Sequence, residues 1–205
     1  LAECLFGLSE IERGTVETRK GVLKKTSPKS AMDLGIAYVP PDRRREGIVK
    51  ELSIALNMVL SKLAEYSSGL LLNRTKIDRT AERYIEMLKI SATSKNQVLS
   101  QLSGGNQQKV VLGRWLDANP DVLLLNEPTR GVDIGAKVEI YALIDDLAKK
   151  GLSIILISSE IPEVLGMCDR VLVMNKGEIS GEFENCELTQ ETLLRAASKI
   201  GGDGL

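Results

Sequence analysis

The 205-residue sequence predicts an α/β fold built around a parallel β-sheet. Short apolar runs at 122–125 and 154–157 are typical of strands buried on both faces, and helical periodicity fills 135–150 between them. Strands that alternate with helices indicate parallel pairing with right-handed crossovers. Aromatic residues make up only 3% of the chain, so the core must be aliphatic, which suits packed parallel strands and helices.

Further elements are expected in order along the chain. Residues 1–8 are typical of the last part of a helix, with Gly7 as its stop. Residues 40–47 are expected to form a loop, because two prolines and a charge run do not fit a central strand. Helical patterns occupy 30–34, 54–66, 76–90, 107–116 and 161–167, and strand patterns occupy 15–18, 35–39, 170–174 and 178–183.

Composition excludes several classes of function. The chain has 27 Lys and Arg against 28 Asp and Glu, a net charge of −1, which argues against a nucleic-acid partner. It contains no histidine, so histidine catalysis and most zinc sites are excluded. Cys4, Cys168 and Cys186 lie far apart, which favours a reduced, cytosolic protein. No apolar run approaches the roughly 20 residues of a membrane helix, so work at a membrane would need partners.

The segment 102–108, Leu-Ser-Gly-Gly-Asn-Gln-Gln, is the clearest candidate for ligand binding. Ser103 can cap the helix that follows, and Gly104 and Gly105 allow the backbone to approach a ligand closely. A helix N-terminus presents free N–H groups and a partial positive charge, which suit a phosphate. A glycine-rich turn before an ordinary helix is the alternative interpretation of Ser-Gly-Gly alone.

The segment 122–129, Val-Leu-Leu-Leu-Asn-Glu-Pro-Thr, has the pattern of a Walker B strand. Glu127 stands at the carboxyl end of the strand, where α/β sheets place ligands, and is the catalytic candidate. A solvated carboxylate at a strand end is the alternative. Asn126 precedes it, and an amide is a poor substitute for a carboxylate beside a hard divalent cation, so no metal ligand is assigned with certainty.

Two short stretches near the predicted strand ends have both a structural and a functional interpretation. Gly131 and Asp133 follow the Walker B pattern, and Asp133 can also cap the next helix. Ser158 and Ser159 follow the strand at 154–157, and Ser159 can cap the helix at 161. We expect the capping role for Ser159 and no strong contact with a phosphate at this position.

The loop after the strand at 35–39 carries three consecutive arginines, Arg43, Arg44 and Arg45. A solvated charge run is their usual explanation. A contact with a transmembrane partner is the alternative. The motif G-x-x-x-x-G-K-[ST] of a phosphate-binding P-loop is not found in the sequence, and we expect the chain to begin just after that position.

Taken together, four stretches resemble the ABC ATPases, and most of all the C-terminal nucleotide-binding half of the ATPase of bacterial ribose-, galactose- and xylose-type importers. They are 38–47, 102–110, 127–133 and 158–166. The resemblance covers nearly the whole chain. It implies a P-loop NTPase-like domain over 1–205 that lacks its N-terminal Walker A segment, with a parallel sheet core and a helical subdomain at about 50–118 that carries the signature loop.

The resemblance also implies roles for residues. The signature loop would contact an ATP held by a second cassette, Glu127 would polarise the attacking water, and the arginine loop would touch the membrane subunit. The positions are Ser103, Gly104, Gly105 and Gln107 in the signature, Asn126 and Glu127 in Walker B, Gly131 and Asp133 in the D-loop, Ser158 in the H-loop, and Arg43, Arg44 and Arg45 as permease contacts.

Two positions depart from the family pattern: Asn126 replaces an Asp, and Pro41 replaces an acid. Both changes weaken a Mg²⁺–nucleotide site built on this half. The hypothesis is therefore an ATPase domain of a sugar importer that uses ATP and Mg²⁺ in the assembled dimer and supplies its signature loop to the partner cassette. Its own site would be degenerate, and this fragment alone would be inactive or weak.

The expected partners are a second ABC cassette, as the N-terminal half of the same polypeptide, and transmembrane permease subunits. A periplasmic or surface sugar-binding protein would take part indirectly, and the domain would lie peripherally at the cytoplasmic face of the membrane. Three alternatives stay open. They are a soluble non-transport ABC ATPase, a nucleoside importer, and a structural or regulatory domain without nucleotide contact.

Overall fold

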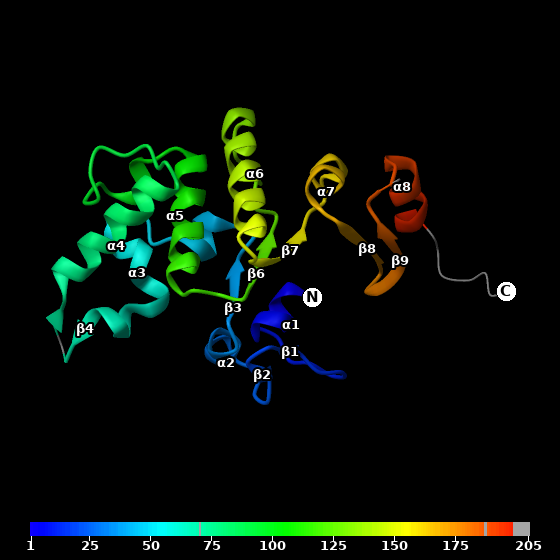
Figure 1. The fold of residues 1–205 in the computed structure, drawn as a ribbon, viewed down its shortest axis with the longest axis horizontal. Helices are drawn as coiled ribbons and strands as arrows, with labels where there is room; N and C mark the ends of the chain where they lie inside the picture. Colours follow the sequence, from blue (N-terminus) through cyan, green and yellow to red (C-terminus); the bar gives the residue numbers. More distant parts are fainter. Residues whose placement is uncertain (70, 187, 199–205) are drawn as a thin grey trace. The chain divides into compact units, whose positions relative to one another are not determined.

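The computed structural model describes residues 1–69, 71–186 and 188–198 (Figure 1). The chain divides into two compact units, Leu1–Ile157 and Ser158–Leu205. Within the described residues, no helix is both long enough and apolar enough to span a membrane.

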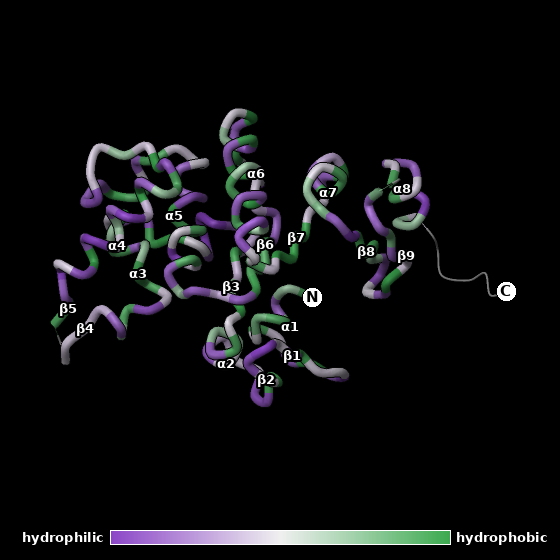
Figure 2. Tube along the Cα trace, in the orientation of Figure 1, coloured by the Kyte–Doolittle hydropathy of each residue, from purple (hydrophilic) through white to green (hydrophobic). Residues whose placement is uncertain are grey.

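A parallel sheet forms the centre of the first unit, with the strand order β3 (Ile36–Val39), β6 (Val122–Asn126), β7 (Ser153–Ile157). Val39 pairs with Leu125, and Asn126 pairs with Ile157, so the carboxyl ends of the strands share one edge. The predicted α/β class with a parallel sheet core is confirmed. Hydrophobic residues run along β6 and β7 (Figure 2), and the middle three residues of β6 are at most 1% exposed. The prediction that 154–157 is buried on both faces is wrong for this chain, because Ile155 is 40% exposed and the rest of that run is only partly buried.

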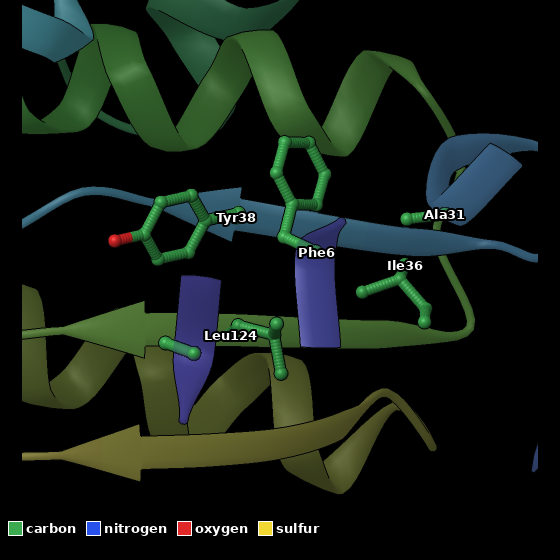
Figure 3. Close-up of a cluster of buried hydrophobic side chains, with 6 residues drawn as sticks. Phe6, Ala31, Ile36, Tyr38 and Leu124 are labelled. Atoms are coloured by element: carbon green, nitrogen blue, oxygen red, sulfur yellow. The ribbon is translucent and has the colours of Figure 1, made fainter. Parts of the chain in front are cut away.

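One hydrophobic cluster joins the N-terminal helices to the sheet (Figure 3). Phe6 from α1 (Ala2–Phe6) lies 5.3 Å from the ring of Tyr38 and makes an edge contact with Trp115 at 5.4 Å. The few aromatic residues of the chain thus contribute a local cluster to an otherwise aliphatic core. Its buried members come from α1, α2 (Pro28–Asp33), β3 and β6 and are Ala2, Phe6, Ala31, Ile36, Tyr38 and Leu124.

Gly7 ends α1 in a left-handed conformation with φ 78°, as the sequence predicts. A Cβ on Gly7 would lie 2.6 Å from the backbone of Ser27, so glycine is required here for close packing as well as for φ. Beyond it, β1 (Glu17–Thr18) and β2 (Gly21–Val22) form a short antiparallel hairpin.

Helices dominate the segment between β3 and β6. The expected loop at 40–47 contains a π-helical turn. The helical pattern at 54–66 divides at Val59, where φ is −104° and ψ is 2°, and the 3₁₀ segment that follows is itself interrupted at Lys62. The elements are η1 (Arg43–Gly47), α3 (Ile54–Val59), the 3₁₀ segment η2 (Leu60–Tyr66), β4 (Ser67–Ser68), β5 (Leu71–Leu72), α4 (Arg74–Met87), the 3₁₀ turn η3 (Leu99–Gln101) and α5 (Gly104–Asp117).

After β6, the helix α6 (Ile134–Lys149) leads to β7. Its buried residues Ile140, Ile144 and Leu147 form one apolar face, as its periodicity predicts.

The second unit contains α7 (Ile161–Met167), β8 (Arg170–Asn175), β9 (Glu178–Glu184) and α8 (Gln190–Ser198). The sequence predicts Arg170 to Met174 as one more strand of the parallel series, and this is wrong. β8 pairs with β9 as an antiparallel hairpin. Lys176 and Gly177 have φ of 49° and 88°, the positive values that a tight two-residue hairpin turn requires. Helix α8 is absent from the sequence-based expectations.

Tyr66 connects η2 to the helices α4 and α5, and this contact predicts a pH dependence. Its hydroxyl lies 3.1 Å from the Thr80 hydroxyl and donates to Asp117 Oδ2 at 2.6 Å. Burial, and then the bond to Asp117, raise the pKa of Tyr66 from 10.0 to about 12. The folded state therefore disfavours the phenolate, so this stability is complete below the unfolded pKa of about 10 and is lost between about pH 10 and 12.

Between pH 9 and pH 11 we expect the free energy of unfolding to fall less steeply in Tyr66→Phe than in the unchanged chain, by about 1 kcal/mol. Urea unfolding at pH 9 and pH 11 measures this difference. The loss in Tyr66→Phe must be subtracted from the loss in the unchanged chain, because burial also raises the pKa of Tyr38 and Tyr84 in both proteins. Equal losses in both proteins would contradict the assignment.

Candidate functional site

The carboxyl edge of the sheet carries Asn126 and Glu127, the residues predicted to form Walker B. Asn126, the last residue of β6, donates from Nδ2 to the Tyr38 hydroxyl at 3.3 Å. Burial raises the pKa of Tyr38, so the phenol is neutral at physiological pH. The Asn126 amide is therefore engaged with a neutral hydroxyl across the strands β3 and β6.

Glu127 leaves the strand in a left-handed conformation with φ 49°, which is unusual for a residue with a side chain. Its N–H donates to the carbonyl of Ile157 at 2.8 Å, and its own carbonyl accepts from Arg130 at 3.1 Å. Holding such a residue in this region costs on the order of 1–3 kcal/mol, and strained residues of this kind cluster at functional sites. The catalytic candidate thus occupies a conformation that its surroundings impose.

Ser103 caps the 14-residue helix α5, as the sequence predicts. Its exposed hydroxyl accepts from the Asn106 N–H at 3.4 Å and from Asn106 Nδ2 at 2.9 Å. Asn106 Oδ1 in turn accepts from the N–H of Ser91 at 2.8 Å. Asn106 therefore holds the Ser103 hydroxyl in place through its backbone and side-chain amides. The sequence analysis missed this role, although an Asn as the third residue of a helix is well placed to contact the N-cap side chain.

Gly105 lies where α5 meets α6. A Cβ built there would lie within van der Waals overlap of the Ala136 Cβ and 3.7 Å from Val132 Cγ1. Sequence reasoning explains this glycine by close approach to a ligand, whereas the structure adds a packing requirement that operates without any ligand.

Gln107 is buried, with 7% of its surface exposed. Its Nε2 donates to the carbonyls of Leu102 at 3.0 Å and Leu99 at 3.3 Å. The side chain thus supports the turn before α5 from inside, while Ser103 stands at the surface. A direct contact of Gln107 with nucleotide stays a prediction, and this geometry favours an indirect role.

The arginine loop divides into one inward and two outward side chains. Arg43 is 6% exposed, and it donates from Nη1 to the Arg130 carbonyl at 2.6 Å and from Nη2 to the Gly131 carbonyl at 2.9 Å. Arg44 and Arg45 are exposed, and only their backbone N–H groups are held, by Asp42 Oδ1. A surface contact is therefore available to Arg44 and Arg45 but not to Arg43.

Asp133 caps a helix, whereas Ser158 makes a hydrogen bond within the turn before α7. Asp133 Oδ1 accepts from the Ala136 N–H at 2.9 Å and starts α6, as its structural interpretation predicts. Ser158 Oγ accepts from the Glu160 N–H at 3.0 Å before α7. Helix α7 begins at Ile161 with Glu160 as its N-cap and has no side-chain cap hydrogen bond, so the predicted cap at Ser159 is wrong. In the part of the chain that the structure describes, no group of three His, Cys, Asp or Glu could hold a metal ion.

The close contact at Gly105 predicts that alanine substitutions at Gly105 and Gly135 change the free energy of unfolding differently. Gly105→Ala should lower the free energy of unfolding by roughly 1–3 kcal/mol, because the new methyl overlaps Ala136 on α6. Gly135→Ala is the matched control on α6: its Cβ would meet only Asp133 Oδ1, at 3.5 Å, so the change should be neutral or stabilise by about 0.5–1 kcal/mol. Urea unfolding of both variants checks this, and equal effects would refute the packing argument.

Comparisons with a protein family and with curated proteins both identify ABC transporter proteins as relatives of this chain. The family described as ABC transporter matches residues 1–130. The chain is 43% identical over 198 residues to the ribose import ATP-binding protein RbsA of Geobacillus kaustophilus. It is 44% identical over 199 residues to the galactose/methyl galactoside import ATP-binding protein MglA of Treponema denticola. Both alignments cover 97% of this chain and 40% of the relative, so the chain spans about two fifths of the length of these relatives.

Solved structures agree on the fold. The ATP-binding cassette MJ1267 of an ABC transporter superposes with a TM-score of 0.79 at 22% identity, over 95% of this chain and 80% of that one. The dimeric structure of MJ0796, a bacterial ABC transporter cassette, gives 0.74 at 19% identity, over 91% and 80%. With the family match over residues 1–130 and these folds, the chain belongs to the ABC transporter family.

Proposed function

We propose that this chain is a nucleotide-binding domain of a carbohydrate ABC importer and that it supplies its signature loop to an ATP held by a partner cassette. Residues 1–205 would act as one such domain. The observation that carries the proposal is the exposed Ser103 at the N-terminus of α5, followed by Gly104 and Gly105. The N-terminus of this 14-residue helix offers free N–H groups and positive potential to a phosphate. The names of the relatives, ribose and galactose import ATP-binding proteins, support sugar as the solute.

The residues at the carboxyl end of β6, which would line this domain's own nucleotide site, fit a Mg²⁺–nucleotide poorly. Asn126 places an amide, bound to the Tyr38 hydroxyl, where a carboxylate would suit the cation. Glu127 keeps its carboxylate at the strand end. ATP and Mg²⁺ would therefore be held chiefly by the partner cassette, and hydrolysis on this domain's own side would be slow or absent.

The exposed surface beside the D-loop position supports a cassette partner. Ile134 and Val138 follow Asp133 one turn apart on α6 and are 83% and 62% exposed. The two side chains share one face of the helix and form a small apolar patch, which suits coverage by another protein. The partner would be the second cassette of the same polypeptide.

The exposed Arg44 and Arg45 are the candidates for contact with transmembrane permease subunits. The domain would then sit at the cytoplasmic face of the membrane, and a sugar-binding protein would act through the permease.

The test is ATP hydrolysis by the complete polypeptide with its permease. Ser103→Ala should lower the rate at least about tenfold, because it removes a group that contacts the phosphate as charge develops. Glu127→Gln should change the rate less than about threefold, because this domain's own site contributes little turnover.

Ser100→Ala is the matched control, since Ser100 is exposed in the turn just before the signature. Thermal unfolding of Ser103→Ala separates a lost helix cap, about 1 kcal/mol, from lost chemistry. A large loss in Glu127→Gln with none in Ser103→Ala would reverse the proposed division of labour.

A further inference from the structure

Arg43 contacts segments that lie far apart in the sequence. Its guanidinium donates to the carbonyls of Arg130 and Gly131, which directly follow the Walker B region. A Cβ built on Gly104 would lie 2.5 Å from Arg43 Nη2, and 3.2 Å from the Gly131 carbonyl oxygen. One side chain thus joins the arginine loop to the D-loop position and fills the space beside the signature turn.

The other end of the same loop is tied to the signature helix. Arg114 on α5 donates from Nη1 to the Gly47 carbonyl at 2.7 Å. The same guanidinium holds Asn57 through its carbonyl at 2.7 Å and its Oδ1 at 3.0 Å. The π-helical turn η1, Arg43–Gly47, is therefore held at both ends by buried guanidinium groups.

These contacts are costly to break because the groups are desolvated. Arg43 and Arg114 are 6% and 8% exposed, and burial lowers the pKa of Arg114 to about 10. A buried guanidinium that loses its carbonyl partners is left with unsatisfied donors in a medium of low dielectric. Arg44 and Arg45, between the two anchors, are exposed. A displacement of this exposed turn must therefore carry Arg43 with it or break its hydrogen bonds.

We propose that Arg43 is a positioning residue that couples the exposed arginine turn to the signature loop and the D-loop position, and that Gly104 must be glycine partly because Arg43 occupies the space of a Cβ. The role of this coupling rests on the proposed function, whereas the contact between Arg43 and Gly104 is independent of that function. Glycine at position 104 thus has two requirements: approach to a ligand and room for the guanidinium.

The contact is tested in the 205-residue chain without nucleotide, by a double-mutant cycle on urea unfolding. Gly104→Ala should lower the unfolding midpoint, and in an Arg43→Ala background the same change should cost less than half as much, because Nη2 is gone. Gly113→Ala is the matched control. Gly113 lies on the same helix as Gly104, but its Cβ would meet Met58 Sδ of α3 at 2.5 Å, so its cost should be equal in both backgrounds. Equal costs of Gly104→Ala in both backgrounds would overturn the contact.

The positioning role is tested by the kinetics of the complete polypeptide with its permease. Arg43→Lys keeps the charge but cannot hold two carbonyls in a fork, so kcat should fall at least about tenfold while KM for ATP stays within about twofold. Arg79→Lys, an exposed position on α4, is the control.

A normal kcat in Arg43→Lys, or an increase in KM alone, would overturn the positioning role even where the double-mutant cycle succeeds. Failure of the proposed function is recognised separately, because Ser103→Ala would then leave hydrolysis unchanged while the stability coupling between Arg43 and Gly104 remained.

Discussion

Pairing of β6 on both edges is the constraint on which the candidate site depends. The strand is hydrogen-bonded to β3 on one side and to β7 on the other, and its side chains at 123–125 are fully shielded. Because the pairing is parallel and in register, the ends of the three strands reach one edge together. Asn126 is brought beside Tyr38, and Glu127 is tied to Ile157 through its N–H while its φ of 49° takes the chain out of the strand. The geometry of this edge follows from the burial of β3 and β6 and from the in-register pairing of the half-exposed β7.

Close approach at the start of α5 is the second organising feature. Gly105 abuts Ala136, and Gly104 abuts the guanidinium of Arg43. Residues that a ligand-binding interpretation would explain completely therefore also satisfy internal packing. This dual demand makes the signature turn sensitive to changes that never touch nucleotide, because a close-packed interior transmits a displacement of a few tenths of an ångström to its neighbours.

Buried charge distinguishes the arginine loop from an ordinary solvated charge run. Arg43 and Arg114 each donate to two backbone carbonyls, and Arg114 also donates to Asn57 Oδ1, whereas the side chains of Arg44 and Arg45 are exposed. A guanidinium can bridge two carbonyls at once because its donors form a rigid planar fork. The arginine loop is thus held to the interior through Arg43 and Gly47, while the side chains of Arg44 and Arg45 are available to a partner.

The sequence by itself determined the α/β class, the helix caps at Ser103 and Asp133, the stop at Gly7 and the candidate strand ends, because these depend on periodicity and on local hydrogen bonding. Only the tertiary structure decided the hairpin pairing of β8 and β9, the inward direction of Gln107 and the separation of Arg43 from its two neighbours. Three consecutive arginines look alike in a sequence, since local composition carries no information about which side chain meets a carbonyl 87 residues away. Such contacts are set by packing between distant segments, and it is these contacts that shape the candidate site.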